Sequence, residues 1–302
     1  MDEPLRVDVH MHLYRSKADG AREKAEYEIW EYGPKDDVVF SRFDGDLDDA
    51  LRAMREAGFA HAVVANLFAA ALLNDDERAA GPEAWADLLV ASNGWACDVA
   101  SERAELTAFV AVDPGILGGD AAARHLREMA ERHGARGVKM HPALGAFMPD
   151  DPRLDAVYRT CADLGLTVLS HTGSDRNGTG FAEPRSFVPV LRAFPDLRLV
   201  LAHLGGASWK QTADIARAFP RVLFDLCEII EWTGAPNAPT ASELARLVAE
   251  IGPERVLLGT DFPWYDLART ADLVMALPGL SVEQREGILG ANAAAALGLP
   301  IR

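Results

Sequence analysis

The chain has 302 residues, of which 49% are hydrophobic and 25% are charged, a composition typical of globular proteins and not of disordered or fibrous ones. Its formal net charge of −16 disfavours nucleic acid and anionic membranes as partners, because both require a positively charged protein face. No apolar run approaches the roughly 18 residues that a membrane-spanning helix needs. These properties indicate a soluble globular protein, and they leave its chemistry open.

The three cysteines, Cys97, Cys161 and Cys227, are odd in number and far apart, without the paired spacing of a metal site. The first six residues lack the basic and apolar regions of a secretory signal. We therefore expect a reduced, cytoplasmic protein.

The pattern of apolar residues predicts regular alternation of strands and helices from the first strand onward. The first strand is followed by a long polar stretch, residues 13–43, which contains several aromatic residues and a short helix near 21–31. We interpret this stretch as a lid over the strand end, with a packed excursion that contacts no ligand as the alternative. The predicted strands are 7–12, 62–65, 106–112, 137–141, 167–171, 197–203, 222–225 and 256–261, and the later helices are 46–56, 82–104, 120–133, 151–165, 184–194, 207–219, 240–251, 266–276 and 281–297.

Eight short apolar strands that alternate with helices predict a (β/α)8 TIM barrel, because parallel strands need crossover helices and right-handed crossovers let the sheet close. A doubly wound open sheet is the alternative. It is disfavoured because no Gly-x-Gly-x-x-Gly follows the first strand. We expect one domain over residues 1–302, with residues 13–43 as an insertion after the first strand.

Polar residues concentrate at the carboxyl ends of the predicted strands, where barrel enzymes build their sites. His10 and His12 lie two apart on the first strand, so both side chains point to one face. The remaining histidines, His61, His125 and His133, lie at the opposite rim or on a helix that we expect to be solvated. Histidine and carboxylate ligands with no nearby thiolate favour zinc, with manganese or iron as substitutes. The residues at the predicted strand ends are His10, His12, His141, His171, His203, Asp225 and Asp261.

Five short motifs on the predicted strands resemble the amidohydrolase superfamily, and within it the amidohydrolase 2 branch, which includes metal-dependent hydrolases, lactonases and decarboxylases. The resemblance covers nearly the whole chain and implies that His10, His12, His171 and Asp261 bind one divalent metal. His203 would then stand beside the open coordination position. The motifs are Asp8-Val9-His10-Met11-His12, Gly137-Val138-Lys139-Met140-His141-Pro142, Ser170-His171-Thr172-Gly173, Leu201-Ala202-His203-Leu204-Gly205-Gly206 and Leu258-Gly259-Thr260-Asp261-Phe262-Pro263.

Lys139 and His141 share one face of the fourth strand, and three interpretations of them stay open. In relatives with two metals a lysine on this strand is carboxylated and bridges them. Alternatively, Lys139 or His141 contacts an anionic group of the substrate, or both are structural. Arg176, in the loop after the fifth strand, is a candidate for binding a substrate carboxylate, with a solvated loop arginine as the alternative.

Aromatic residues in loops at the same rim are candidates for the wall of a substrate pocket, although ordinary loop packing explains any one of them equally well. Asp225 is interpreted as a residue that orients a metal-bound histidine, or as a simple loop cap. The aromatic candidates are Trp232, Trp264, Phe147, Phe181 and Phe262.

The first interpretation of function is a metal-dependent hydrolase in which an activated water attacks a small cyclic or aromatic amide or lactone. Asp261 would take the proton, and His203 would polarise the carbonyl or return the proton to the leaving group. The alternative is a metal-dependent, non-oxidative decarboxylase of an aromatic or muconate-type acid. A barrel that has lost catalysis and only binds is a third interpretation, disfavoured by the complete ligand set. The resemblance also implies a possible homodimer.

Overall fold

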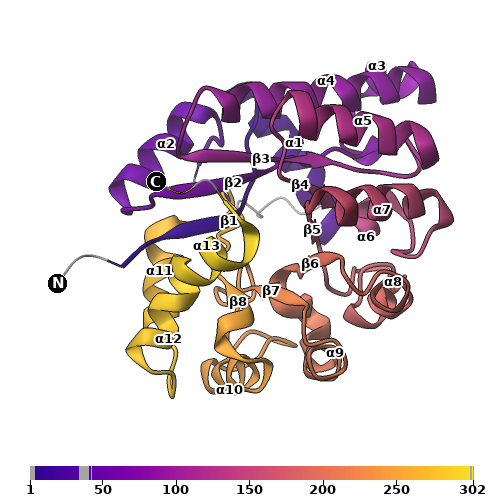
Figure 1. The fold of residues 1–302 in the computed structure, drawn as a ribbon. Coiled ribbons are helices and arrows are strands. Elements are labelled where there is room, and N and C mark those ends of the chain that lie inside the picture. The colour runs from indigo at the N-terminus through magenta and orange to yellow at the C-terminus, as the bar shows by residue number, and fades with distance from the viewer. Residues whose placement is uncertain (1–3, 34–40, 42, 300, 302) are drawn as a thin grey trace.

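In the computed structural model, which describes residues 4–33, 41, 43–299 and 301, eight strands form one parallel sheet in the order of the sequence. Helices surround the sheet, as Figure 1 shows, and the predicted (β/α)8 barrel is confirmed. The strands are β1 (Val7–Met11), β2 (His61–Ala65), β3 (Leu106–Ala111), β4 (Gly137–Met140), β5 (Thr167–Ser170), β6 (Arg198–Leu201), β7 (Leu223–Asp225) and β8 (Val256–Leu257).

Several of the α-helices start where a side chain accepts a free backbone N–H group of the first turn. Ser16, Asp46, Asn74 and Thr240 each accept a backbone hydrogen bond in this way. The α-helices are α1 (Lys17–Tyr32), α2 (Leu47–Glu56), α3 (Asp75–Ala79), α4 (Pro82–Ser101), α5 (Gly119–Arg132), α6 (Pro142–Gly145), α7 (Asp155–Leu164), α8 (Val188–Ala193), α9 (Thr212–Ala218), α10 (Ala241–Ile251), α11 (Leu267–Met275), α12 (Val282–Glu286) and α13 (Asn292–Leu297).

Several predicted boundaries are wrong in detail. The helix predicted at 207–219 is α-helical only over α9, and the preceding segment, Ala202–Gln211, is kinked because the residues from His203 to Gly206 have positive φ angles that interrupt right-handed helical geometry. Strand β8 ends at Leu257, since the chain then turns to place Asp261 at φ 56°. The helix predicted at 281–297 is interrupted by a π-turn at Gly287–Ala291.

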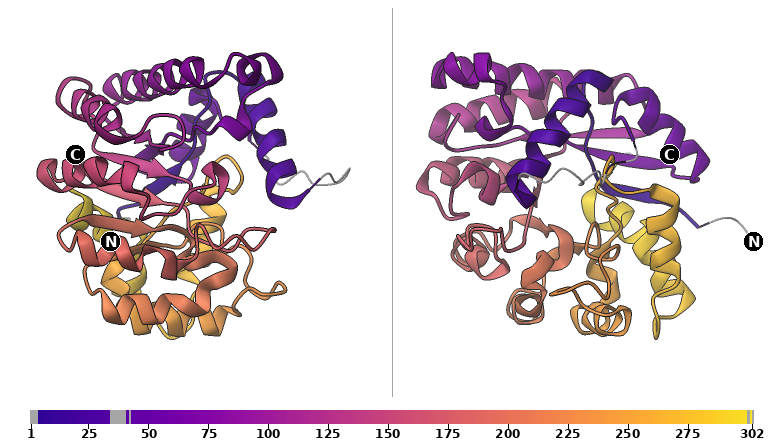
Figure 2. Two further views of the ribbon diagram at one scale, coloured as in Figure 1. Left: turned by 90° about the vertical axis from the view of Figure 1, so that its right-hand side faces the viewer. Right: turned by 180° about the vertical axis from the view of Figure 1, so that it is seen from behind.

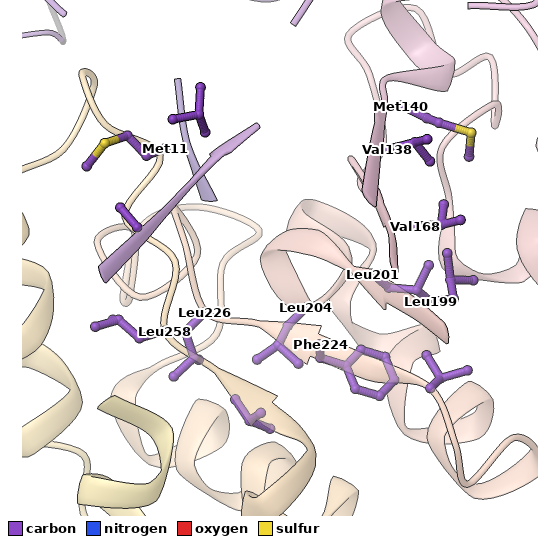
Figure 3. Close-up of a cluster of buried hydrophobic side chains, with 14 of the residues drawn as sticks. Met11, Val138, Met140, Val168, Leu199, Leu201, Leu204, Phe224, Leu226 and Leu258 are labelled. Carbon is purple, nitrogen blue, oxygen red and sulfur yellow. The ribbon is translucent and has the colours of Figure 1, made fainter. Parts of the chain in front are cut away.

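Two hydrophobic clusters hold the barrel. The larger one joins the outer faces of the strands to the helices, and Figure 3 shows labelled members of it from neighbouring strands. The smaller one contains Val9, Phe109 and Leu169 together with Leu297 of α13, so the C-terminal helix packs under the barrel interior. Helix α1 lies at the opposite end of the barrel (Figure 2). None of the described helices is long and apolar enough to cross a membrane.

The seam between β1 and β8 is joined by backbone hydrogen bonds and by one buried carboxylate. Val9 N–H donates to Leu258 O, and Asp261 N–H donates to His10 O. Asp8, which is 0% exposed, accepts from the Thr260 hydroxyl, from Thr260 N–H at 3.0 Å and from His10 N–H at 2.9 Å. Asp8 thereby fixes the strand that carries His10 to the segment that carries Asp261.

We expect Asp8→Ala to lower the free energy of unfolding by about 3 kcal/mol, because it leaves buried donors without an acceptor. Urea denaturation measures this change. Asp196→Ala, which removes a surface ion pair with Arg221, is the control and should change stability far less. Equal stability of Asp8→Ala and the native protein would contradict the role of Asp8 at the seam.

Candidate active site

The two histidines of β1 converge on one carboxylate at the carboxyl rim of the barrel. His10 Nε2 lies 3.5 Å from Asp261 Oδ1, and His12 Nε2 lies 3.1 Å from the same oxygen. Both rings are nearly inaccessible to solvent, whereas the Asp261 side chain is 15% exposed. The pairing that the His-x-His spacing predicts is therefore present.

The second nitrogen of each ring is held by a fixed acceptor. His10 Nδ1 lies 3.0 Å from Asp225 Oδ2, and His12 Nδ1 lies 2.7 Å from the carbonyl oxygen of Ala65. When Nδ1 of a histidine donates a hydrogen bond, the lone pair of Nε2 is available to a metal. Protein acceptors commonly orient metal-binding histidines in this way. Asp225 is thus placed as an orienter of His10, one of the two roles considered for it.

The donor set fits a divalent metal. His10, His12 and Asp261 each offer one ligand atom within a sphere small enough for a single ion. Two atoms that are each about 2.1 Å from one metal lie roughly 3–3.5 Å apart, which matches the separations between the imidazoles and the carboxylate. Burial lowers the pKa of His10 well below its ordinary value, so this ring is in the neutral form that binds metals.

His171 and His203 lie beside this cluster. His171 Nδ1 is 3.0 Å from His203 Nε2, and the His171 ring stacks on His141 with ring centroids 3.8 Å apart. His203 also belongs to a second group of possible ligands with Glu228 and Asp261. The role of His171 as a metal ligand and that of His203 beside the metal stay predictions.

Three residues of the site have left-handed backbone angles, His203 at φ 59°, Glu228 at φ 62° and Asp261 at φ 56°. Side chains other than glycine rarely adopt this conformation, and where it occurs the surrounding structure must hold it. For His203 the anchor is its own N–H, which donates to Asp225 at 2.7 Å. Asp225 therefore positions two histidines from different strands.

Glu228 was not identified from the sequence. Its carboxylate lies 3.4 Å from His203 Nδ1, and burial together with the nearby Asp261 carboxylate raises its pKa well above the ordinary value. The available signal was an acidic residue three positions after Asp225, which ends β7.

Burial by itself raises the pKa of Asp261, but His12, His10 and His203 together hold it below the ordinary value.

The expectation that no thiol lies near the histidines is wrong. Cys227 Sγ lies 3.0 Å from His10 Nδ1 and 3.0 Å from His203 Nδ1, because the chain turns inward directly after Asp225. Burial raises the pKa of the Cys227 thiol, so it is neutral in this environment. The thiol faces Nδ1 of both rings, whereas Nε2 of His10 points toward Asp261 and Nε2 of His203 points toward His171.

The two candidates on the fourth strand lie inside the cluster. Lys139 is 2% exposed, and its Nζ contacts His10 Nε2, so a metal bound at that nitrogen requires Nζ to move away. His141 caps α6 by accepting from Leu144 N–H at 3.1 Å, and its Nε2 lies 3.3 Å from the Tyr27 hydroxyl. Their contacts with substrate, and carboxylation of Lys139, stay predictions.

The described part of the 13–43 stretch covers one side of this rim. Tyr27 and Trp30 of α1 pack edge-on against His141, with ring centroids 5.8 and 5.6 Å apart. Trp264 packs against Tyr27 at 5.1 Å and His12 at 5.7 Å. Residues 34–40 and 42 lie outside the described part of the chain.

The other rim candidates separate into two groups. Trp232 lines a cavity of about 190 Å³ beside His171, whereas Phe262 and Phe147 are buried in the hydrophobic core. Arg176 is exposed and donates to the carbonyl of Ile29 in α1 at 3.2 Å.

The expectation that His125 is solvated is wrong. Its ring is half-buried, with Nε2 3.1 Å from the Asn93 amide, because α5 packs this side against α4.

A parallel eight-stranded barrel with histidines and carboxylates gathered at its carboxyl rim defines the class of barrel enzymes with a candidate metal centre. The amidohydrolase family model matches residues 7–299, and the chain belongs to this family, in its amidohydrolase 2 branch. No curated protein sequence matches the chain significantly.

Solved structures similar to this chain share its fold over nearly the full length. One is an uncharacterised TIM-barrel protein from Bordetella bronchiseptica, 20% identical over 98% of this chain and 99% of that chain, with a TM-score of 0.76. Another is 2,6-dihydroxybenzoate decarboxylase from Rhizobium, 15% identical over 99% of both chains, with a TM-score of 0.68. A third is 5-carboxyvanillate decarboxylase from Novosphingobium aromaticivorans with bound manganese, 13% identical over 98% of this chain and 97% of that chain, with a TM-score of 0.70.

We expect Asp225→Asn to weaken metal binding by about tenfold or more, because His10 loses the charged acceptor that orients it. Titration of the metal-free protein with zinc or manganese against a competing chelator measures the affinity. Asp113→Asn is the control, since Asp113 is also buried, at 4% exposed, but accepts from Gly115 N–H and not from a histidine. Unchanged affinity in Asp225→Asn would show that His10 does not depend on this contact.

Proposed function

We propose that this protein is a metal-dependent, non-oxidative decarboxylase of a small aromatic or muconate-type carboxylic acid. The observation that carries the proposal is the cavity of about 190 Å³ that lies directly against the histidine cluster and is lined by His171 and Glu228. A cavity of about 150 Å³ is enough for one benzene ring. The likeness to two decarboxylases of aromatic acids supports the same chemistry.

Hydrolysis of an amide or lactone, the first interpretation of the sequence, has less support. It would use the same rim residues, and the family includes both reactions, so the histidine and carboxylate cluster does not separate them. The two similar structures of decarboxylases favour decarboxylation.

His10, His12 and Asp261 would hold the divalent metal, with His171 as the fourth ligand that the family resemblance implies. The metal would supply positive charge for binding the substrate carboxylate. Zinc suits a set of imidazoles and one carboxylate, and the manganese bound in the similar decarboxylase supports manganese as well.

Non-oxidative decarboxylation breaks one carbon–carbon bond, releases carbon dioxide and puts one proton on the carbon that held the carboxylate. The site must therefore hold a proton donor near that carbon. His203 and Asp261 belong to one compact group beside the cavity residue Glu228. His203 Nδ1 faces the carbonyl oxygen of Cys227 at 3.3 Å, which fixes one nitrogen and leaves Nε2 directed toward His171.

The decisive test supplies the purified, metal-loaded protein with hydroxybenzoates, aminobenzoates and muconate-type acids and measures carbon dioxide release. We expect release with at least one aromatic acid, its loss on chelation of the metal, and its return on adding zinc or manganese. Incorporation of ¹⁸O from water into a lactone or amide, without carbon dioxide release from any acid, would show hydrolysis instead.

We expect His203→Asn to lower kcat for decarboxylation about 100-fold or more, because a proton-transfer group is removed, while the metal content stays near that of the native protein. His10→Ala should lose both metal and activity. Elemental analysis and initial rates on the same preparations make the comparison. Loss of metal from His203→Asn would instead place His203 among the ligands.

A further inference from the structure

A second cavity lies at the amino-terminal rim of the barrel, the end opposite to the histidine cluster. Its volume is about 290 Å³, and most of its lining comes from residues at or just before the starts of β5, β6, β7 and β8. Arg198 is the first residue of β6, Arg221 lies shortly before β7, and Arg255 directly precedes β8. Because parallel strands begin at one rim, three guanidinium groups from distant parts of the chain line one cavity.

The lining of this cavity is positively charged, although the whole chain has a net charge of −16. Against the three arginines, Asp196 is the single carboxylate among the described residues that line it. Arginine stays protonated in proteins, so the lining has a surplus of two positive charges. Asp196 pairs with Arg221 at 2.6 Å, but both side chains are exposed and the pair is therefore weak.

The arginines differ in how many of their N–H groups the protein already uses. Arg198 donates only from Nη1, to Gly165 O at 3.1 Å and Leu297 O at 3.5 Å, and its Nε and Nη2 have no acceptor among the described residues. Arg221 donates only to Asp196. Arg255 is fixed by backbone carbonyls and contributes mainly its charge. Its acceptors are the carbonyl oxygens of Ala216, Phe219, Val222 and Ile251.

A buried hydroxyl without a partner lies next to Arg198. Thr167, the first residue of β5, is paired with Arg198 across the two strands. Leu169 and Val200, two residues further along each strand, belong to the hydrophobic cluster inside the barrel, so Thr167 and Arg198 point to that same side. Thr167 is 0% exposed, and its hydroxyl has no hydrogen-bond partner among the described residues. Buried hydroxyls are nearly always hydrogen-bonded, which indicates that a further polar group belongs at this end of the barrel.

We propose that this cavity binds a phosphate group, either inorganic phosphate or the phosphate of a small phosphomonoester. The planar guanidinium groups of Arg198 and Arg221 match phosphate oxygens with paired N–H donors. A phosphate dianion balances the surplus of two positive charges, whereas a monocarboxylate leaves one of them unbalanced. A cavity of about 150 Å³ holds a benzene ring, so about 290 Å³ leaves room for an organic part beside the phosphate. This site is independent of the function proposed for the opposite rim.

The experiment measures the affinity of the metal-loaded protein for inorganic phosphate and for glycerol 3-phosphate by calorimetry at fixed ionic strength. We expect Arg198→Gln to weaken binding about tenfold or more, because it removes charge-assisted donors. Arg221→Gln should weaken it about threefold, and Asp196→Asn should strengthen it about threefold, since one removes a positive and the other a negative charge. Both of these side chains are exposed, so their variants should fold normally.

Arg192→Gln is the matched control, since Arg192 is an exposed arginine of α8 outside the cavity lining, and it should keep the native affinity. His10→Ala separates this cavity from the metal centre, because phosphate also binds divalent metals. We expect this variant to keep its phosphate affinity although it loses the metal.

Three results would overturn the proposal: no saturable binding at millimolar phosphate, acetate binding as tightly as phosphate, or loss of binding in His10→Ala with unchanged affinity in the variants of Arg198 and Arg221. The two sources of phosphate are distinguished by the same titrations. Tighter binding of glycerol 3-phosphate than of inorganic phosphate would support a phosphomonoester as the ligand, and the opposite order would support inorganic phosphate.

Discussion

The site depends on two buried carboxylates that fix the ends of different strands to each other. Asp8 joins β1 to the segment after β8 through Thr260, and Asp225 at the end of β7 holds His10 and the backbone of His203. Both are 0% exposed, so their acceptor atoms are unavailable to solvent and must be satisfied by these donors. The contacts of Asp8 and Asp225 thus position three segments: β1 with His10, the segment after β6 with His203, and the segment after β8 with Asp261.

That arrangement explains why the ligand atoms converge although they belong to segments about 250 residues apart in the chain. His10 and His12 follow from the period of β1, but Asp261 reaches them only because the chain turns left-handed after β8. His203 and Glu228 adopt the same unusual backbone conformation after β6 and β7. Strained residues of this kind cluster where a protein places reactive groups, and here the supporting contacts come from Asp225 and the neighbouring strands.

The cavity beside the histidine cluster would add a second level of selection to the proposed reaction. The histidines and Asp261 would serve the reaction, whereas the cavity walls come from α1 and from the segments after β5, β6 and β7. In the proposed function, the cavity residues would decide which acid fits, and the residues of the rim would decide the reaction. This division is why fold and ligand set restrict the substrate less than they restrict the chemistry.

The sequence by itself determined the barrel and the shared rim of His10, His12 and Asp261, because strand periodicity and strand–helix alternation are local patterns. It did not determine the boundaries around His203 and Asp261, because local apolar runs carry no sign of the left-handed turns that follow them. Glu228 and Cys227 were decided only by tertiary structure, which turns the chain inward after β7 and brings both beside His203. Only the tertiary structure decided that Trp232 lines the cavity beside the histidine cluster whereas Phe262 is buried in the core. The burial of an aromatic residue in a loop depends on what packs over it and not on its position in the sequence.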